Sequence, residues 1–126
     1  MNASPPIQRE PANYTSLGYL RVAAAAPSLV IGDAIANAKS ILEQANDLAA
    51  EGVTLAVFPE LCLTGYSAED LFFSEALMAD TQNALQHLCA CDMPLLIVGA
   101  PWRLSDGRLI NCAVAIGNHR VLGMIP

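Results

Sequence analysis

One apolar segment, residues 53–58, constrains the fold most, because it has the length of a strand and ends at Pro59. Such a run is typical of a strand buried on both faces, which occurs where helices cover a sheet. An amphipathic helix is predicted directly before it, with Asp33 as the N-cap and Gly52 as the terminating residue. A helix followed by a buried strand indicates an α/β unit.

A second apolar run, residues 19–26, precedes that helix and ends at Pro27. It predicts another buried strand, which completes the order strand, helix, strand. Within the helix, apolar residues recur at helical spacing and are expected to face the core. The polar residues between them, including Asn37 and Lys39, are predicted on the opposite face.

The second half of the chain predicts one more helix and three more strands. Ser74 is placed as the N-cap of this helix, whose predicted core face comprises Leu77, Met78, Thr81, Ala84, Leu85, Leu88 and Cys91. Strands are predicted over residues 95–98, 109–116 and 120–125, and a tight turn at Gly117-Asn118 joins the last two. A hairpin beside helix-connected strands indicates a mixed sheet.

The charge balance excludes several classes of partner. Six Lys and Arg against twelve Asp and Glu give a formal charge of −6. So few cations cannot neutralise a phosphate backbone, and we expect no binding to nucleic acid or to an anionic membrane. A hydrophobic fraction of 54% excludes a disordered chain. Neither a secretory signal nor a membrane-span-length apolar run is visible, so the expected location is the cytoplasm.

The four cysteines, Cys62, Cys89, Cys91 and Cys112, are irregularly placed along the chain. Their spacing matches neither a disulfide framework nor the paired motifs of zinc sites. We therefore expect reduced, mostly buried thiols and no metal site.

Glu60 is the residue best placed for chemistry, since it follows the apolar strand of residues 53–58. Ligands of α/β sheets bind beyond the carboxyl ends of strands. Apolar neighbours such as Phe58 and Leu61 are expected to desolvate the carboxylate partly, which suits a general acid or base. The alternative is a structural glutamate that faces water or pairs with an arginine such as Arg103.

The segment around Glu60 also carries a family resemblance. Phe58-Pro59-Glu60 after a buried strand resembles the first catalytic signature of the nitrilase, or carbon–nitrogen hydrolase, superfamily. The continuation Gly65-Tyr66-Ser-Ala-Glu-Asp-Leu resembles one branch in particular, the glutaminase domains of bacterial NAD⁺ synthetases. Further pieces, such as Asn111-Cys-Ala-Val, agree in order, and the resemblance covers residues 19–126.

The resemblance implies an α/β fold, an α-β-β-α sandwich with a mixed sheet. Residues 17–126 would be its N-terminal portion, after a flexible leader of residues 1–16. The implied reaction is hydrolysis of the glutamine amide by a Glu-Lys-Cys mechanism, with Glu60 as general base and Tyr66 in the glutamine pocket. No cofactor is implied for this reaction. ATP, Mg²⁺ and an NAD⁺ precursor are implied only for a synthetase domain of the same polypeptide outside this chain, and a homo-oligomer is implied for the assembly.

Two residues of the family's catalytic set have no counterpart here. The family's lysine follows the proline that matches Pro126, and its nucleophilic cysteine comes later. Lys39 and Cys62 do not occupy the matching positions. The 126 residues alone are therefore expected to be inactive. Two other functions stay open: another nitrilase-type amidase or carbamoylase, and a non-catalytic α/β fragment with a scaffold or interaction role.

Overall fold

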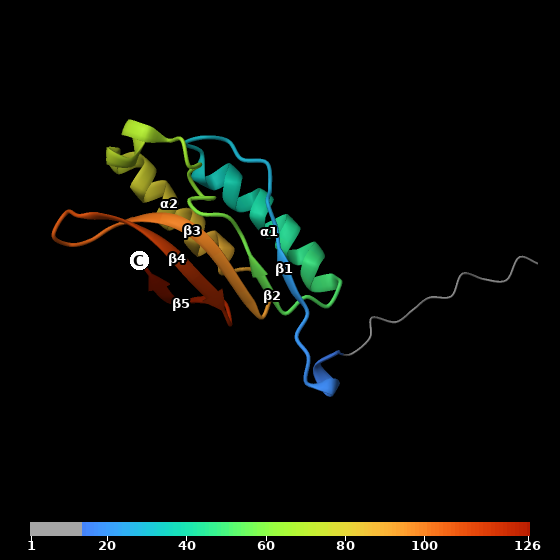
Figure 1. The fold of residues 1–126 in the computed structure, drawn as a ribbon. Coiled ribbons are helices and arrows are strands. Elements are labelled where there is room, and N and C mark those ends of the chain that lie inside the picture. The colour runs from blue at the N-terminus through green and yellow to red at the C-terminus, as the bar shows by residue number, and fades with distance from the viewer. Residues whose placement is uncertain (1–13) are drawn as a thin grey trace, which may run out of the picture.

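A computed structural model describes residues 14–126, which form one five-stranded sheet and two α-helices (Figure 1). The strands follow the sheet order β1-β2-β3-β4-β5, with β1, β2 and β3 parallel and the β3–β4 and β4–β5 pairs antiparallel. The predicted order of elements and the mixed sheet are therefore confirmed. The elements are β1 (Val22–Ala24), α1 (Ala34–Ala50), β2 (Leu55–Val57), α2 (Glu75–Leu88), β3 (Leu95–Arg103), β4 (Leu109–Gly117) and β5 (Arg120–Ile125).

Two short 3-10 helices complete the described chain, Tyr14–Leu17 and Glu69–Phe73. The predicted leader, residues 1–16, lies outside the described residues except for its last three, which belong to the first of these helices. Within residues 14–126, no helix is long and apolar enough to cross a membrane.

Both α-helices pack on the same face of the sheet (Figure 1). Alternate strand residues point to that face and are buried in one apolar core, which includes Ala56, Leu96, Val98, Val114 and Ile116. The opposite face of the sheet is open among the described residues, where Val57 is 41% and Ile125 64% exposed. The prediction that residues 53–58 are buried on both faces is therefore wrong, because the helices cover one face only.

The first strand is shorter and more exposed than predicted. It is hydrogen-bonded on one side only, to β2, and spans Val22–Ala24 instead of residues 19–26. Tyr19, Leu20 and Val22 are each at least 60% exposed. The expected burial fails because this strand lies at the edge of the sheet and only its inward residue, Ala23, packs against the core.

The predicted caps are confirmed. The Asp33 side chain accepts a hydrogen bond from the Ala36 N–H at 2.9 Å, and the Ser74 hydroxyl accepts one from the Leu77 N–H at 3.4 Å. Gly52 has a φ of +82°, the left-handed conformation expected after a helix end. All seven residues predicted on the core face of this helix are buried, but α2 ends at Leu88, so Cys91 lies beyond it.

Asn37 corrects the predicted polar face of α1. Its side chain is 1% exposed. It links the segment before α1 to the segment after β2. The Nδ2 group donates to the carbonyls of Val30 (2.8 Å) and Leu63 (2.9 Å), and Oδ1 accepts from the Val30 N–H (2.7 Å). Helical periodicity misplaced this residue because its partners are backbone groups distant in the sequence.

The third strand was predicted to span residues 95–98. In the structure it continues through Pro101. Residues 97 and 99 direct their carbonyls toward the β2 side, where Ile97 accepts from Phe58 N–H and Gly99 from Leu63 N–H. By the alternation of a strand, the nitrogen of Pro101 faces the same side, beyond the end of β2. No ladder hydrogen bond is lost there, so proline is tolerated.

The hairpin between β4 and β5 turns at Asn118 and His119, one residue later than predicted. Both residues have positive φ values, +50° and +57°, as the two central residues of a type I′ turn require.

Candidate functional site

Glu60 lies where the sequence predicted it, just beyond the carboxyl end of β2. The Phe58 N–H donates to the Ile97 carbonyl at 2.9 Å and keeps the chain beside β3. A tight turn follows directly, in which the Cys62 N–H donates to the Pro59 carbonyl at 3.2 Å. The turn brings Glu60 over the open face of the sheet, since its partner there, Asn111, belongs to that face.

Gly99 of β3 forms the platform on which this turn rests. A Cβ added at Gly99 would lie against the amide nitrogen of Leu61, 2.5 Å from the carbonyl oxygen of Pro59 and 2.7 Å from Cα of Glu60. All three are backbone atoms, which no side-chain rotation can move aside. Glycine therefore allows the peptide that carries Glu60 to lie directly on the strand.

The turn also contains a residue in an unusual backbone conformation. Leu61 has a φ of +52°, in the left-handed region that side chains other than glycine rarely adopt. The conformation is held from both sides, because the Pro59 carbonyl accepts from the Cys62 N–H at 3.2 Å and the Leu61 carbonyl accepts from the Gly65 N–H at 2.8 Å. Such local strain is typical of sites where geometry matters more than stability.

The Glu60 carboxylate has one hydrogen-bond partner among the described side chains. Nδ2 of Asn111, on β4, donates to its Oε1 atom at 2.5 Å. Glu60 is exposed, so the partial desolvation expected from its apolar neighbours is not provided by residues 14–126. Its neighbours Phe58 and Leu61 instead turn into the interior.

Of the two structural alternatives, pairing with an arginine is not supported by the described residues, whereas Glu60 does face water. Nη2 of Arg103 donates to the carbonyl of Phe73 at 3.2 Å. The ion pairs within residues 14–126 are Arg108 with Asp106 and His119 with Asp92, so none involves Glu60.

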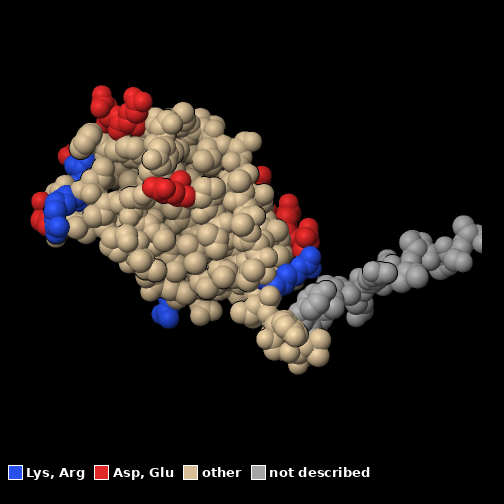
Figure 2. All heavy atoms as spheres, viewed as in Figure 1, with Lys and Arg blue, Asp and Glu red and all other residues tan. Residues whose placement is uncertain are grey.

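Glu60 and Asn111 border a cavity of about 330 Å³ on the open face of the sheet. The rest of its lining is mainly apolar and comes from β2, β3, β4 and the end of β5, including Val57, Ile97, Ala113 and Ile125. The side of the molecule drawn in Figure 2 is largely uncharged, with the Lys and Arg side chains at its margins. A carboxylate at the rim of an uncharged hollow can accept a proton from a bound group.

Tyr66 is not brought to this cavity by the described part of the chain. It lies on the loop after Gly65, is 70% exposed and is absent from the cavity lining. Its phenol is free to meet a ligand or another segment.

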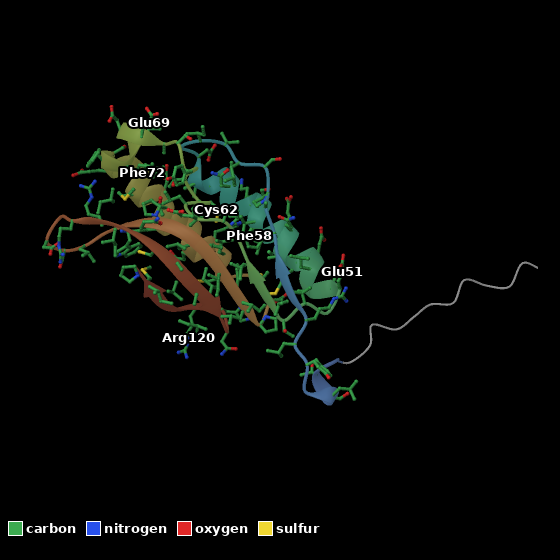
Figure 3. All side chains as sticks on the ribbon, viewed as in Figure 1. Glu51, Phe58, Cys62, Glu69, Phe72 and Arg120 are labelled. Carbon is green, nitrogen blue, oxygen red and sulfur yellow. The ribbon has the colours of Figure 1, made fainter. Side chains whose placement is uncertain are left out.

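Cys62 is a core residue, as predicted, and not a reactive thiol. It is fully buried, and its Sγ lies 3.6 Å from the Gly99 carbonyl oxygen. Burial raises the pKa of this thiol to about 11. Figure 3 shows Cys62 and Phe58 toward the middle of the molecule. Burial also raises the pKa of Cys112, so neither thiol is poised as a nucleophile.

Metal-ligating side chains do not converge anywhere in residues 14–126, where no group of three or more His, Cys, Asp or Glu could hold an ion. Within residues 14–126 the candidate site thus consists of one oriented carboxylate, its amide partner and an apolar hollow. Sequence reasoning located the carboxylate but assigned no role to Gly99 or Asn111. The available signals were a glycine inside an apolar strand, which marks close backbone approach, and an asparagine inside another.

The family model for carbon–nitrogen hydrolase matches residues 21–124 of the chain. A glutamine-dependent NAD(+) synthetase of Mycobacterium tuberculosis is 44% identical over 112 residues, which are 86% of this chain and 16% of the relative. A glutamine-dependent NAD(+) synthetase of Mycobacterium leprae is 38% identical over 117 residues, 90% of this chain and 17% of the relative. The chain therefore spans about a sixth of the length of these relatives.

Solved structures show the same fold. A glutamine-dependent NAD(+) synthetase from Cytophaga hutchinsonii superposes with a TM-score of 0.77 at 29% identity over 83% of this chain and 18% of that one. The enzyme from Acinetobacter baumannii gives a TM-score of 0.74 at 32% identity over 78% of this chain and 19% of that one. The match over residues 21–124, together with the fold and the carboxylate after β2, shows that the chain belongs to the carbon–nitrogen hydrolase family.

Proposed function

We propose that this chain is the N-terminal part of a glutaminase domain that hydrolyses the side-chain amide of glutamine. The ammonia released would serve ATP-dependent NAD⁺ synthesis in a synthetase domain of the same polypeptide. The observation that carries this proposal is the 44% identity to a glutamine-dependent NAD(+) synthetase over 112 residues that include Glu60. The position of the Glu60 carboxylate, oriented at the rim of a cavity, supports it.

In this proposal Glu60 is the general base of a Glu-Lys-Cys mechanism. It takes the thiol proton of a cysteine, whose sulfur attacks the amide carbon to give a tetrahedral intermediate. A lysine stabilises the oxyanion, the amide nitrogen leaves as ammonia with the proton that Glu60 took, and water hydrolyses the thioester to glutamate and free thiol. The resemblance implies that the lysine directly follows the proline matching Pro126 and that the cysteine comes later, so both would come from chain outside residues 1–126. Cys62, which is buried, and Lys39, which lies on α1, do not occupy the matching positions.

Tyr66 is proposed to line the glutamine pocket. Its exposure on the loop after the Glu60 turn supports this role, because a fully packed phenol could not meet a substrate. ATP, Mg²⁺ and the NAD⁺ precursor are assigned only to the synthetase domain. Residues 17–126 are proposed as an incomplete domain that is inactive alone, and the whole protein as a cytoplasmic homo-oligomer.

The test uses the complete natural polypeptide that carries these residues. It is incubated with glutamine labelled with ¹⁵N in the amide, ATP, Mg²⁺ and the carboxylic precursor of NAD⁺, and the NAD⁺ formed is analysed by mass spectrometry. We expect ¹⁵N in the carboxamide of NAD⁺, and excess unlabelled ammonia should dilute it. Hydrolysis of other small amides or carbamoyl compounds in preference to glutamine would instead support a different amidase.

A further inference from the structure

We propose that Asn111 is a positioning residue that orients the Glu60 carboxylate as a base. The inference rests on the proposed role of Glu60 and extends it to a second side chain. Nδ2 of Asn111 donates to Oε1 of Glu60 at 2.5 Å, between residues 51 positions apart in the chain.

The contact joins two rigid parts of the molecule. Asn111 lies in β4, opposite Pro101 of β3 in a ladder of eight residue pairs. Glu60 lies on the turn that rests against the backbone of Gly99, also in β3. The backbones of both residues are thus positioned by the same strand, β3. The side-chain hydrogen bond then restricts the rotamers that the long glutamate side chain can adopt.

The chemistry of the pair suits a base. An ionised carboxylate only accepts hydrogen bonds, so the amide must present its nitrogen, which leaves the second carboxylate oxygen free to take a proton. The donor is neutral, and no ion pair within residues 14–126 involves Glu60.

Asn111 is not a packed residue of the core, because its side chain is exposed. The side chain lies on the open face of the sheet, and its hydrogen bond to Glu60 joins two exposed groups. At the rim of a mainly apolar hollow, this polar side chain is expected to act by holding the neighbouring carboxylate through its hydrogen bond.

The test compares Asn111→Ala and Asn111→Asp in the complete polypeptide, with glutamine hydrolysis as the assay. Asn111→Ala removes the donor, and kcat should fall about 10- to 100-fold while KM and the melting temperature change little. Asn111→Asp is of the same size but places a second negative charge at the carboxylate, so its loss in kcat should be larger. Asn83→Asp makes the same chemical change on the exposed face of α2 and should leave kcat unchanged.

A double-mutant cycle separates positioning from other roles. Glu60→Asp shortens the side chain and withdraws the carboxylate from Asn111, so kcat falls but a base remains. We expect Asn111→Ala to cause no further loss of kcat in the Glu60→Asp background. An equal further loss in that background, or a change confined to KM, would overturn the inference. A wild-type polypeptide without glutaminase activity would instead refute the proposed function itself.

Discussion

Replacing Gly99 with alanine adds one methyl group to β3 directly beneath the turn that carries Glu60. The new Cβ would lie 2.5 Å from the carbonyl oxygen of Pro59 and 2.7 Å from Cα of Glu60, whereas ordinary contacts begin at 3.4 Å. Because these atoms belong to the backbone, the turn must move outward by about 1 Å. Misplacing a reacting group by that distance can lower a rate about 100-fold, and overpacking costs about 1–3 kcal/mol of stability.

Gly123→Ala is the matched control for this prediction. Gly123 lies in β5 of the same sheet, and nothing lies within 4 Å of a Cβ added there. Glutamine hydrolysis and the melting temperature would be measured for both variants in the complete polypeptide. We expect Gly99→Ala to lower both quantities and Gly123→Ala to leave both within error. Equal behaviour of the two variants would refute the argument that the Gly99 platform positions Glu60.

Two further predictions concern the interior. Asn37→Ala should lower the free energy of unfolding by about 3 kcal/mol, because the N–H and C=O of Val30 and the C=O of Leu63 lose their hydrogen-bond partner. The control Asn83→Ala should change the free energy of unfolding by less than about 0.5 kcal/mol. Denaturant titrations measure both values. The pKa of Cys62 is raised to about 11 because burial disfavours the thiolate, so the unfolded state loses this proton first as the pH rises. The free energy of unfolding should therefore fall between about pH 9 and 11, by at most about 1.4 kcal/mol per pH unit. Peptide mapping after alkylation at pH 8 should find half-buried Cys89 modified before Cys62. Rapid labelling of Cys62 in the folded protein would contradict its assigned burial.

Local signals in the sequence predicted the elements and their order well. The caps at Asp33 and Ser74 and the core face of α2 follow from hydrogen bonding and periodicity within one segment. Errors arose where tertiary context decides. The exposure of Val57 depends on which faces of the sheet the helices cover, and the strand through Pro101 depends on where β2 ends.

The candidate site was predicted in part for the same reason. Glu60 follows a strand, so its place at the carboxyl edge was visible in the sequence. Its contact with Asn111 depends on the register of β3 with β4 and on a turn that crosses Gly99. Neither can be derived from spacing along the chain, because the two side chains are 51 residues apart. Likewise, burial of Asn37 requires partners on two distant loops.

The central claim is that Glu60 acts as the base in glutamine hydrolysis, and Glu60→Gln tests it most directly. The variant keeps the size of the side chain but cannot take a proton, and both Glu60 and its partner Asn111 are exposed, so stability should change little. The measurement is NAD⁺ formation by the complete polypeptide with glutamine and, separately, with free ammonia. We expect glutamine-dependent turnover to fall about 10²–10⁴-fold and ammonia-dependent turnover to persist. Glutamine-dependent turnover within a few-fold of the parent, or equal losses with both nitrogen sources, would contradict the claim.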